Sequence, residues 1–216
     1  KEKGEFAEKW IQTLVDKGLM LPLMEAFYTV QGEGHYSGTP AFFLRIGGCD
    51  VGCHWCDVKE SWDANLHPPT HIDDMLTNVQ STPAKTVVIT GGEPLMWDMG
   101  PLTELLKKNG MSVHIETSGA YPLSGRFDWI CLSPKKNSPP QKAIIPLADE
   151  LKVIVHNLND FKWAEEFSEQ CHNNCKLFLQ PEWSKEKEMM PKIIDYVMNN
   201  PEWNISLQTH KYMGIP

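Results

Sequence analysis

Three of the six cysteines in this 216-residue chain crowd into one short segment, Cys49-Asp-Val-Gly-Cys53-His-Trp-Cys56. Thiolates are soft ligands that suit zinc or iron–sulfur clusters. A structural zinc site takes four protein ligands, but the only nearby candidates for a fourth ligand are His54 and Asp57. Three thiols and one vacant position therefore predict a 4Fe–4S cluster with an open fourth iron.

The remaining cysteines and several histidines are interpreted as structural. Cys131, Cys171 and Cys175 lie far from the cluster segment and are expected to be small apolar core residues. The same structural or surface interpretation is given to three histidines, His114, His156 and His172. Clustered cysteines without a regular framework indicate metal or redox chemistry in a reducing compartment.

Composition narrows the class of protein further. The 41% hydrophobic and 22% charged content is typical of a folded globular chain. The 28 acidic and 20 basic residues give a net charge of −8, which argues against sequence-independent binding to nucleic acid. No apolar run reaches the roughly 18–20 residues of a membrane span, and the amino terminus lacks the features of a secretory signal. We expect a cytoplasmic protein with a single domain over residues 1–216, in which residues 1–20 form a helical extension.

Apolar, β-prone runs alternate with helical patterns along the chain, as in α/β proteins. The expected strands are 41–46, 86–90, 112–116, 128–133, 151–155, 175–180 and 204–208, with a possible edge strand at 23–30. The expected helices are 5–17, 72–80, 101–109, 160–171 and 185–199. The connections 117–127 and 134–144 are rich in Pro, Gly, Ser or Lys and carry no helical pattern.

Polar loops follow nearly every expected strand at its carboxyl end. They comprise residues 47–56, 91–94, 117–119, 133–135, 156–157, 180–182 and 209–211. Because sites in parallel α/β folds are assembled at the carboxyl ends of strands, we expect these loops to meet in one deep active site.

The cysteine loop after one strand and Gly91-Gly92-Glu93-Pro94 after the next resemble the radical S-adenosylmethionine (SAM) superfamily. A narrower resemblance, to the 7-carboxy-7-deazaguanine synthase family, covers most of the chain. It rests on these motifs and on residues 27–34, 43–45, 55–57, 89–95, 116–119, 133–135 and 208–211.

The resemblance implies a fold, a reaction and a set of cofactors. The fold would be a partial, reduced (β/α) barrel of the radical SAM type. The reaction would convert 6-carboxy-5,6,7,8-tetrahydropterin into 7-carboxy-7-deazaguanine with loss of ammonia, on the route to queuosine and related tRNA bases. The cofactors would be a 4Fe–4S cluster, SAM and Mg2+. The partners would be the pterin, a flavodoxin-like or ferredoxin-like electron donor and a second copy in a homodimer.

The resemblance also assigns residues to SAM. Cys49, Cys53 and Cys56 would hold the cluster, and the open iron would bind SAM. The expected SAM contacts are Trp55, Gly91, Gly92, Glu93, Ser118, Ser133, Pro134, Lys135, Gln180, Pro181, Glu182 and Trp183. Among these, the Gly91-Gly92-Glu93 turn and its carboxylate would receive the amino group of SAM.

Further residues are assigned to the pterin: Val30, Gln31, Gly32, Arg45, Thr90, His210 and Pro216. The Gln31 amide could pair with the pterin edge, and Gly32 could let the backbone approach a flat ligand. Arg45 stands in an apolar run and needs an anion, either the substrate carboxylate or an internal Asp or Glu. The tail from His210 is expected to fold over the mouth of the site, where the Pro216 carboxylate would accept hydrogen bonds from the pterin.

One position departs from the family pattern. Thr or Ser usually follows Cys56-Asp57 and helps to hold Mg2+, whereas this chain has Val58. A valine side chain offers no oxygen to a cation that requires oxygen ligands. Either Mg2+ has a reduced role, or substrate, water, backbone or a neighbouring carboxylate supplies its ligands.

Two alternatives remain. A glycyl-radical activase of the same superfamily would keep the cysteines and Gly91-Gly92-Glu93, but not the features at Gln31 and Arg45. A zinc-stabilised interaction module would have no catalytic activity.

Overall fold

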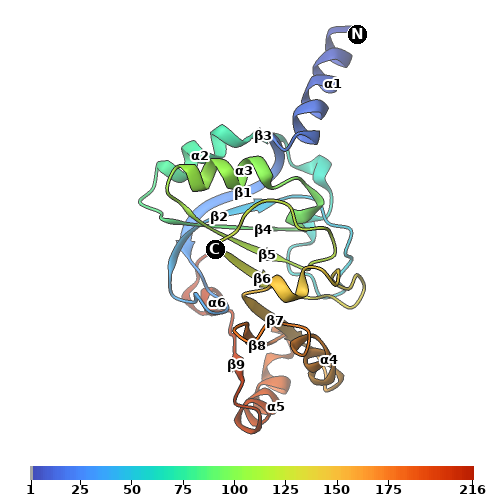
Figure 1. Ribbon diagram of the computed structural model, residues 1–216, viewed down its shortest axis with the longest axis vertical. Helices are drawn as coiled ribbons and strands as arrows, with labels where there is room; N and C mark the ends of the chain where they lie inside the picture. Colours follow the sequence, from blue (N-terminus) through green and yellow to red (C-terminus); the bar gives the residue numbers. More distant parts are fainter. Residues whose placement is uncertain (1) are drawn as a thin grey trace.

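One curled sheet organises the molecule (Figure 1). The computed structural model describes residues 2–216, and within them nine strands follow the order β3-β1-β2-β4-β5-β6-β7-β8-β9. The strands are β1 (Met20–Val30), β2 (Pro40–Ile46), β3 (Pro69–His71), β4 (Thr86–Gly91), β5 (Ser112–Thr117), β6 (Trp129–Leu132), β7 (Glu150–Val155), β8 (Lys176–Pro181) and β9 (Trp203–Ile205).

The sheet is largely parallel and does not close. β1 pairs antiparallel with β2 and β3, and every pairing from β2 to β9 is parallel. Within the described residues, the end strands β3 and β9 do not pair with each other. The fold is therefore a partial β/α barrel, as predicted.

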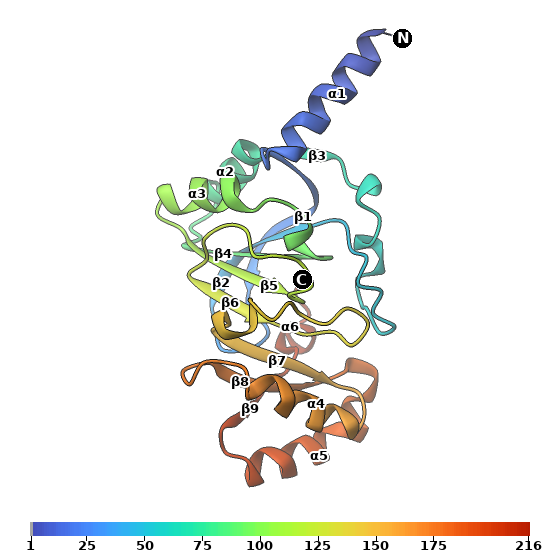
Figure 2. The same cartoon turned by 45° about the vertical axis from the view of Figure 1, so that its right-hand side comes forward.

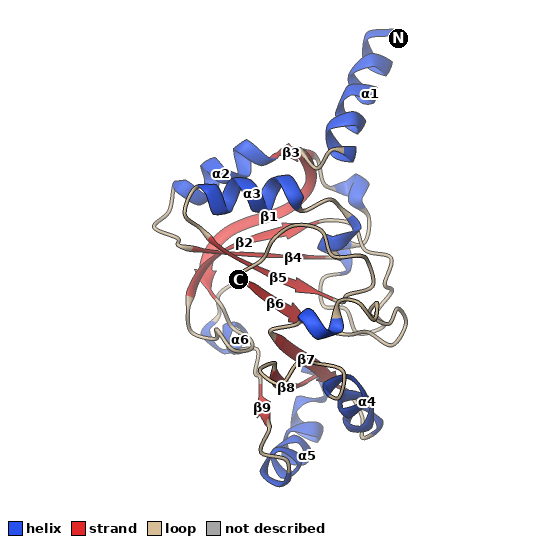
Figure 3. Ribbon diagram, viewed as in Figure 1, coloured by secondary structure: helices blue, strands red, loops and turns tan. Residues whose placement is uncertain are grey.

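Helices cover the outer side of this sheet at both ends (Figure 3). The α-helices of the described residues are α1 (Glu2–Asp16), α2 (Ile72–Gln80), α3 (Gly100–Lys108), α4 (Asn159–Ser168), α5 (Glu186–Asn199) and α6 (Thr209–Met213), of which α2 and α3 cover one end of the sheet and α4 and α5 the other. The core lies between α2, α3, α4 and α5 and the sheet, whereas α1 projects away from the body (Figure 2). No helix in the described part of the chain combines the length and the apolar character of a bilayer span.

Most expected elements match the observed ones closely, and the differences have local causes. The connections after β5 and β6 contain no α-helix, as predicted; the second carries only a short 3-10 turn at Ile145–Leu147. The last expected strand, 204–208, is wrong at its end, because the chain leaves the sheet at Ser206, whose hydroxyl donates to Gln180. β3 and α6 are too short to produce a periodic pattern.

The strand register brings polar side chains into one row on the inner face. Glu25 pairs with Arg45, and Arg45 pairs with Thr90. The pairing of Ile89 with Ile115 places Thr90 beside Glu116. Because neighbouring strands lie about 4.8 Å apart, these residues form a continuous polar strip.

Candidate active site

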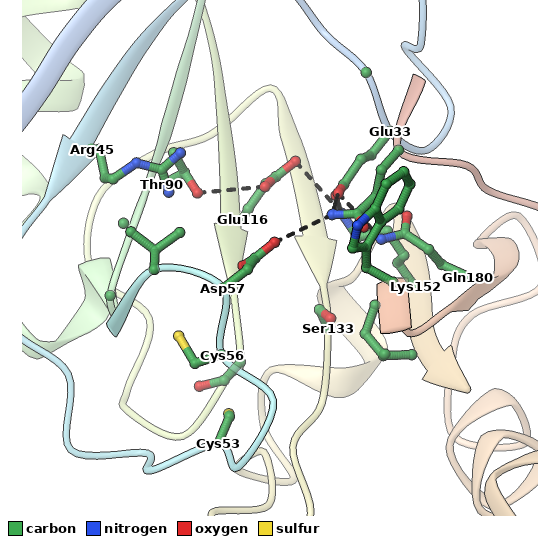
Figure 4. Close-up of a pocket in the computed structure, with 18 of the residues that line it drawn as sticks. Glu33, Arg45, Cys53, Cys56, Asp57, Thr90, Glu116, Ser133, Lys152 and Gln180 are labelled. Carbon is green, nitrogen blue, oxygen red and sulfur yellow. Dashed lines mark hydrogen bonds and ion pairs between the residues drawn. The ribbon is translucent and has the colours of Figure 1, made fainter. Parts of the chain in front are cut away.

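A cavity of about 520 Å³ opens at the carboxyl ends of the strands (Figure 4). Loops after β1, β2, β4, β5, β6, β8 and β9 contribute to its wall. All three clustered cysteines line it, together with most residues that the sequence assigned to ligands. Six of the seven polar loops predicted to converge therefore do so, whereas the loop 156–157 after β7 does not line the cavity.

The Gly91-Gly92 turn packs directly against the cysteine loop. The N–H of Gly92 donates to Ile46 O at 3.0 Å, and the N–H of Glu93 donates to Gly48 O at 2.9 Å. A Cβ on Gly92 would lie only 2.4 Å from Gly48 O. The turn needs glycine because it supports the loop that carries the cysteines.

The donor set in this loop suits a multi-iron cluster better than a single zinc ion. The three thiols are free and partly exposed, and burial raises the pKa of Cys49 to about 11. His54 is exposed and does not line the cavity. Within residues 2–216, no three His, Cys, Asp or Glu side chains are placed to hold one metal ion.

Glu93 is placed differently from the expectation that it receives the amino group of SAM. It is 1% exposed and does not line the cavity. Its carboxylate accepts hydrogen bonds from the hydroxyls of Thr117 and Ser118 and from the N–H groups of Ser118 and Leu95. The geometry therefore gives Glu93 a supporting position beneath the turn.

The other residues expected at SAM line the cavity, with Pro134 as the exception. The lining members are Trp55, Gly91, Gly92, Ser118, Ser133, Lys135, Gln180, Pro181, Glu182 and Trp183. Lys135 donates to Ser133 Oγ at 2.7 Å, and burial lowers its pKa. The Trp55 ring stacks on His156 with 5.2 Å between ring centroids. Both Trp55 Nε1 and His156 Nδ1 are buried without a hydrogen-bond partner among the described residues.

Arg45 has an internal partner and also faces the cavity. Its Nε donates to Glu25 Oε2 at 2.8 Å, so one of the two anions considered from the sequence is present. Its two terminal nitrogens make no hydrogen bond within the described part of the chain. They extend toward Thr90 at the cavity wall (Figure 4), where an anionic ligand could reach them.

Gln31 and Gly32 line the cavity, but their immediate contacts are with protein. The Gln31 amide donates to Glu116 Oε1 at 3.2 Å and accepts from the N–H of Glu33 at 3.1 Å. A Cβ on Gly32 would lie 2.2 Å from Nδ1 of His210. The approach of His210 thus requires glycine at position 32.

The segment after β9 contributes to the cavity wall through α6. Thr209 donates to Gly32 O through both its N–H, at 3.0 Å, and its hydroxyl, at 2.8 Å. These bonds hold α6 against the loop that follows β1. His210, Lys211 and Pro216 line the cavity as a result.

Val58 lines the cavity at the position where the family pattern has Thr or Ser. The neighbouring Asp57 is engaged through one oxygen, since its Oδ2 lies 3.3 Å from the Lys211 ammonium and 3.5 Å from the Gln208 amide, and its side chain is 59% exposed. The apolar side chain at position 58 does not fit a Mg2+ site that requires oxygen ligands in octahedral geometry.

A buried ionic group is the feature that sequence reasoning missed. Lys152, Glu33 and Glu116 all line the cavity, and the Lys152 ammonium contacts both carboxylates. A signal was present, because Lys152 stands in an apolar strand run just as Arg45 does. The ion pairs of Lys152 with Glu33 and Glu116 could not be predicted from the sequence, because the three residues come from separate parts of the chain.

Known proteins resemble this chain over most of its length. Residues 44–130 match the sequence profile of the Radical SAM superfamily. The 7-carboxy-7-deazaguanine synthase of Flavobacterium psychrophilum is 62% identical, with 96% of this chain and 99% of that protein covered. The Escherichia coli synthase is 34% identical, with 91% and 100% covered. The crystal structure of QueE from Escherichia coli matches with a TM-score of 0.80 at 30% identity, over 90% of this chain and 96% of that chain.

Proposed function

Because this chain belongs to the 7-carboxy-7-deazaguanine synthase family of the radical SAM superfamily, we propose that its cavity converts 6-carboxy-5,6,7,8-tetrahydropterin into 7-carboxy-7-deazaguanine with loss of ammonia. The product serves queuosine biosynthesis. One observation carries the proposal: the cysteine loop, the Gly91-Gly92 turn and Arg45 open into the same cavity. Because the similar proteins are 7-carboxy-7-deazaguanine synthases, the two alternatives, a glycyl-radical activase and a zinc-stabilised module, are not favoured.

The family implies a 4Fe–4S cluster and SAM, which together supply the carbon-centred radical that removes a hydrogen atom from substrate. In our proposal Cys49, Cys53 and Cys56 hold the cluster. SAM lies along the wall formed by the Gly91-Gly92 turn, Trp55 and residues 133–135 and 180–183, including Pro134 just outside the lining. Glu93 does not contact SAM in this proposal; its buried carboxylate fixes the Gly91-Gly92 turn through hydrogen bonds to the protein.

The pterin would occupy the wall opposite the cysteine loop. Arg45 faces its carboxylate with the two nitrogens that Glu25 leaves free. Thr90 is 8% exposed and sits between Arg45 and Glu116 in the polar strip, so its hydroxyl is fixed beside the ligand. Val30, Gln31, Gly32, His210 and Pro216 enclose the remaining side, which orients the substrate and excludes water.

We propose that turnover depends on Mg2+ less than it does in relatives with Thr or Ser at the position of Val58. The support is chemical, since Val58 offers no oxygen and Asp57 is paired with Lys211. No step of the proposed reaction is assigned to this metal.

The remaining partners are inferred from the family resemblance. A flavodoxin-like or ferredoxin-like protein would deliver single electrons to the cluster, and a second copy would complete a homodimer. The cytoplasm is the proposed compartment, because all six cysteines are free thiols and the cluster requires reducing conditions.

Anaerobic turnover tests the proposed function. Purified protein with a reconstituted cluster, SAM and dithionite should convert 6-carboxytetrahydropterin into 7-carboxy-7-deazaguanine, detected by mass spectrometry. Cys53→Ala should lose iron and activity together, because no nearby thiol replaces it. The matched control Cys175→Ala alters a thiol outside the cavity and should keep both. A cluster-loaded protein that leaves the pterin unchanged would contradict the proposal.

A further inference from the structure

Lys152 is a buried charged residue that none of the expected ligand contacts explains. It lies on β7, its side chain is 4% exposed, and it lines the cavity. A lysine is almost never buried unless its ammonium is paired. Its partners therefore indicate what the residue does.

Two carboxylates face this one ammonium (Figure 4). Lys152 donates a hydrogen bond to Glu33, and its Nζ lies 3.7 Å from Glu116 Oε1. Burial raises the pKa of Glu33, but the charge of Lys152 and its hydrogen bond outweigh this effect and bring the pKa to about 2. Burial lowers the pKa of Lys152, but Glu116 and Glu33 raise it well above its ordinary value.

The two carboxylates are not equally satisfied by the protein. Glu33 also accepts from the amides of Gln180, at 3.2 Å, and Gln208, at 3.0 Å. Glu116 has only Gln31 at 3.2 Å and Thr90 at 3.4 Å besides the more distant ammonium. Its side chain is 24% exposed. Glu116 therefore retains capacity to accept hydrogen bonds from a ligand.

The polar strip separates Glu116 from Arg45 by a distance that one bicyclic ligand can span. The two residues stand on β5 and β2 with β4 between them, so their backbones are about 10 Å apart. A bicyclic ligand can bridge that distance with an anionic group at one end and N–H donors at the other. The 6-carboxytetrahydropterin substrate has a carboxylate at one end and N–H donors at the other.

We propose that Lys152 is a positioning residue for substrate recognition, which holds Glu116 so that its carboxylate accepts hydrogen bonds from N–H groups of the reduced pterin. This inference rests on the proposed function. Glu33 anchors the ammonium, and the ammonium in turn supplies the positive charge beside Glu116. Without Lys152, two carboxylates would face each other in the cavity wall, and Glu116 would be held only by the two neutral donors Gln31 and Thr90.

Binding measurements on the cluster-loaded protein test the proposal. Isothermal titration calorimetry gives the affinity for SAM alone and for 6-carboxytetrahydropterin with SAM saturating and no reductant. Lys152→Met should weaken pterin binding about 30-fold or more, as for one partner lost from a buried charge pair, and leave SAM binding near that of the unchanged protein. Lys136→Met is the matched control, because Lys136 pairs with Asp160 outside the cavity and should alter neither affinity.

A double-substitution cycle shows whether Lys152 acts through Glu116. Glu116→Gln should weaken pterin binding selectively, and adding Lys152→Met to it should weaken binding little further. If Lys152→Met does not fold, Glu33→Gln/Lys152→Met removes one charge of each sign and carries the same comparison. Equal losses for both ligands, or fully additive effects, would show that Lys152 only supports the fold. If the unchanged enzyme failed to convert the pterin, the proposed function itself would be wrong.

Discussion

Substitution of Glu93 by Gln tests whether this buried carboxylate stabilises the Gly91-Gly92 turn through its hydrogen bonds to the protein. Four donors converge on its two oxygens: the N–H groups of Leu95 and Ser118 and the hydroxyls of Thr117 and Ser118. Oε1 accepts from the N–H and hydroxyl of Ser118, each at 2.8 Å, and Oε2 accepts from the N–H of Leu95 at 3.2 Å. The hydroxyl of Thr117 lies 2.7 and 2.8 Å from the two oxygens.

A glutamine cannot satisfy these donors in either orientation of its amide. An NH2 group at the Oε1 position faces the N–H of Ser118, and at the Oε2 position it faces the N–H of Leu95. One buried donor without an acceptor costs about 1–3 kcal/mol, and the loss of charge assistance in the other bonds adds about 1–2 kcal/mol. We therefore expect Glu93→Gln to lower the free energy of unfolding by about 2–5 kcal/mol.

Anaerobic guanidinium denaturation of the cluster-loaded protein measures this change. The control is Glu104→Gln, an exposed residue on α3, which should stay within about 0.5 kcal/mol of the unchanged protein. Because the turn supports the cysteine loop, SAM affinity should fall together with stability in Glu93→Gln. A variant with unchanged stability but weakened SAM binding would refute the reasoning and make Glu93 a direct ligand.

Three further outcomes are expected. Arg45→Met should weaken pterin binding by roughly 2–5 kcal/mol and SAM binding far less, as measured by calorimetry; equal losses would make Arg45 structural. Val58→Thr should increase the stimulation of turnover by Mg2+, because it adds a hydroxyl oxygen to the cavity wall; an unchanged response would show that position 58 does not control the metal. Burial lowers the pKa of His114 below its ordinary 6.5, against the opposite effect of Asp128 and Asp149, so its contribution to stability is present above pH 6.5 and is lost as the pH falls through the lowered pKa. His114→Gln should therefore flatten the decline of the unfolding free energy between about pH 7.5 and 5.5, and an unchanged slope would exclude His114 as its source.

Local patterns were enough to predict the framework of this protein. The spacing of Cys49, Cys53 and Cys56 is a local property, so the sequence alone predicted a shared cluster site. The parallel α/β pattern predicted that the polar loops meet at one rim, because nearly every strand run was followed by a loop of reactive or small residues, and six of the seven predicted loops line the cavity. The helix-poor connections after β5 and β6 were predictable for the same local reason, since Pro and Gly disfavour helices wherever they stand.

Tertiary structure alone decided which partners the charged residues have. Arg45 was recognised from the sequence as a charge in an apolar strand, and Lys152 stands in a similar run but was missed. Their partners Glu25, Glu33 and Glu116 are brought to them by strand register and by the curl of the sheet. Glu93 follows a glycine turn that suggests a ligand contact, yet packing of β5 against that turn surrounds its carboxylate with protein donors. A side chain's type and spacing state what chemistry it can do, whereas only the neighbours that folding supplies determine whether its hydrogen bonds go to the protein or remain for a ligand.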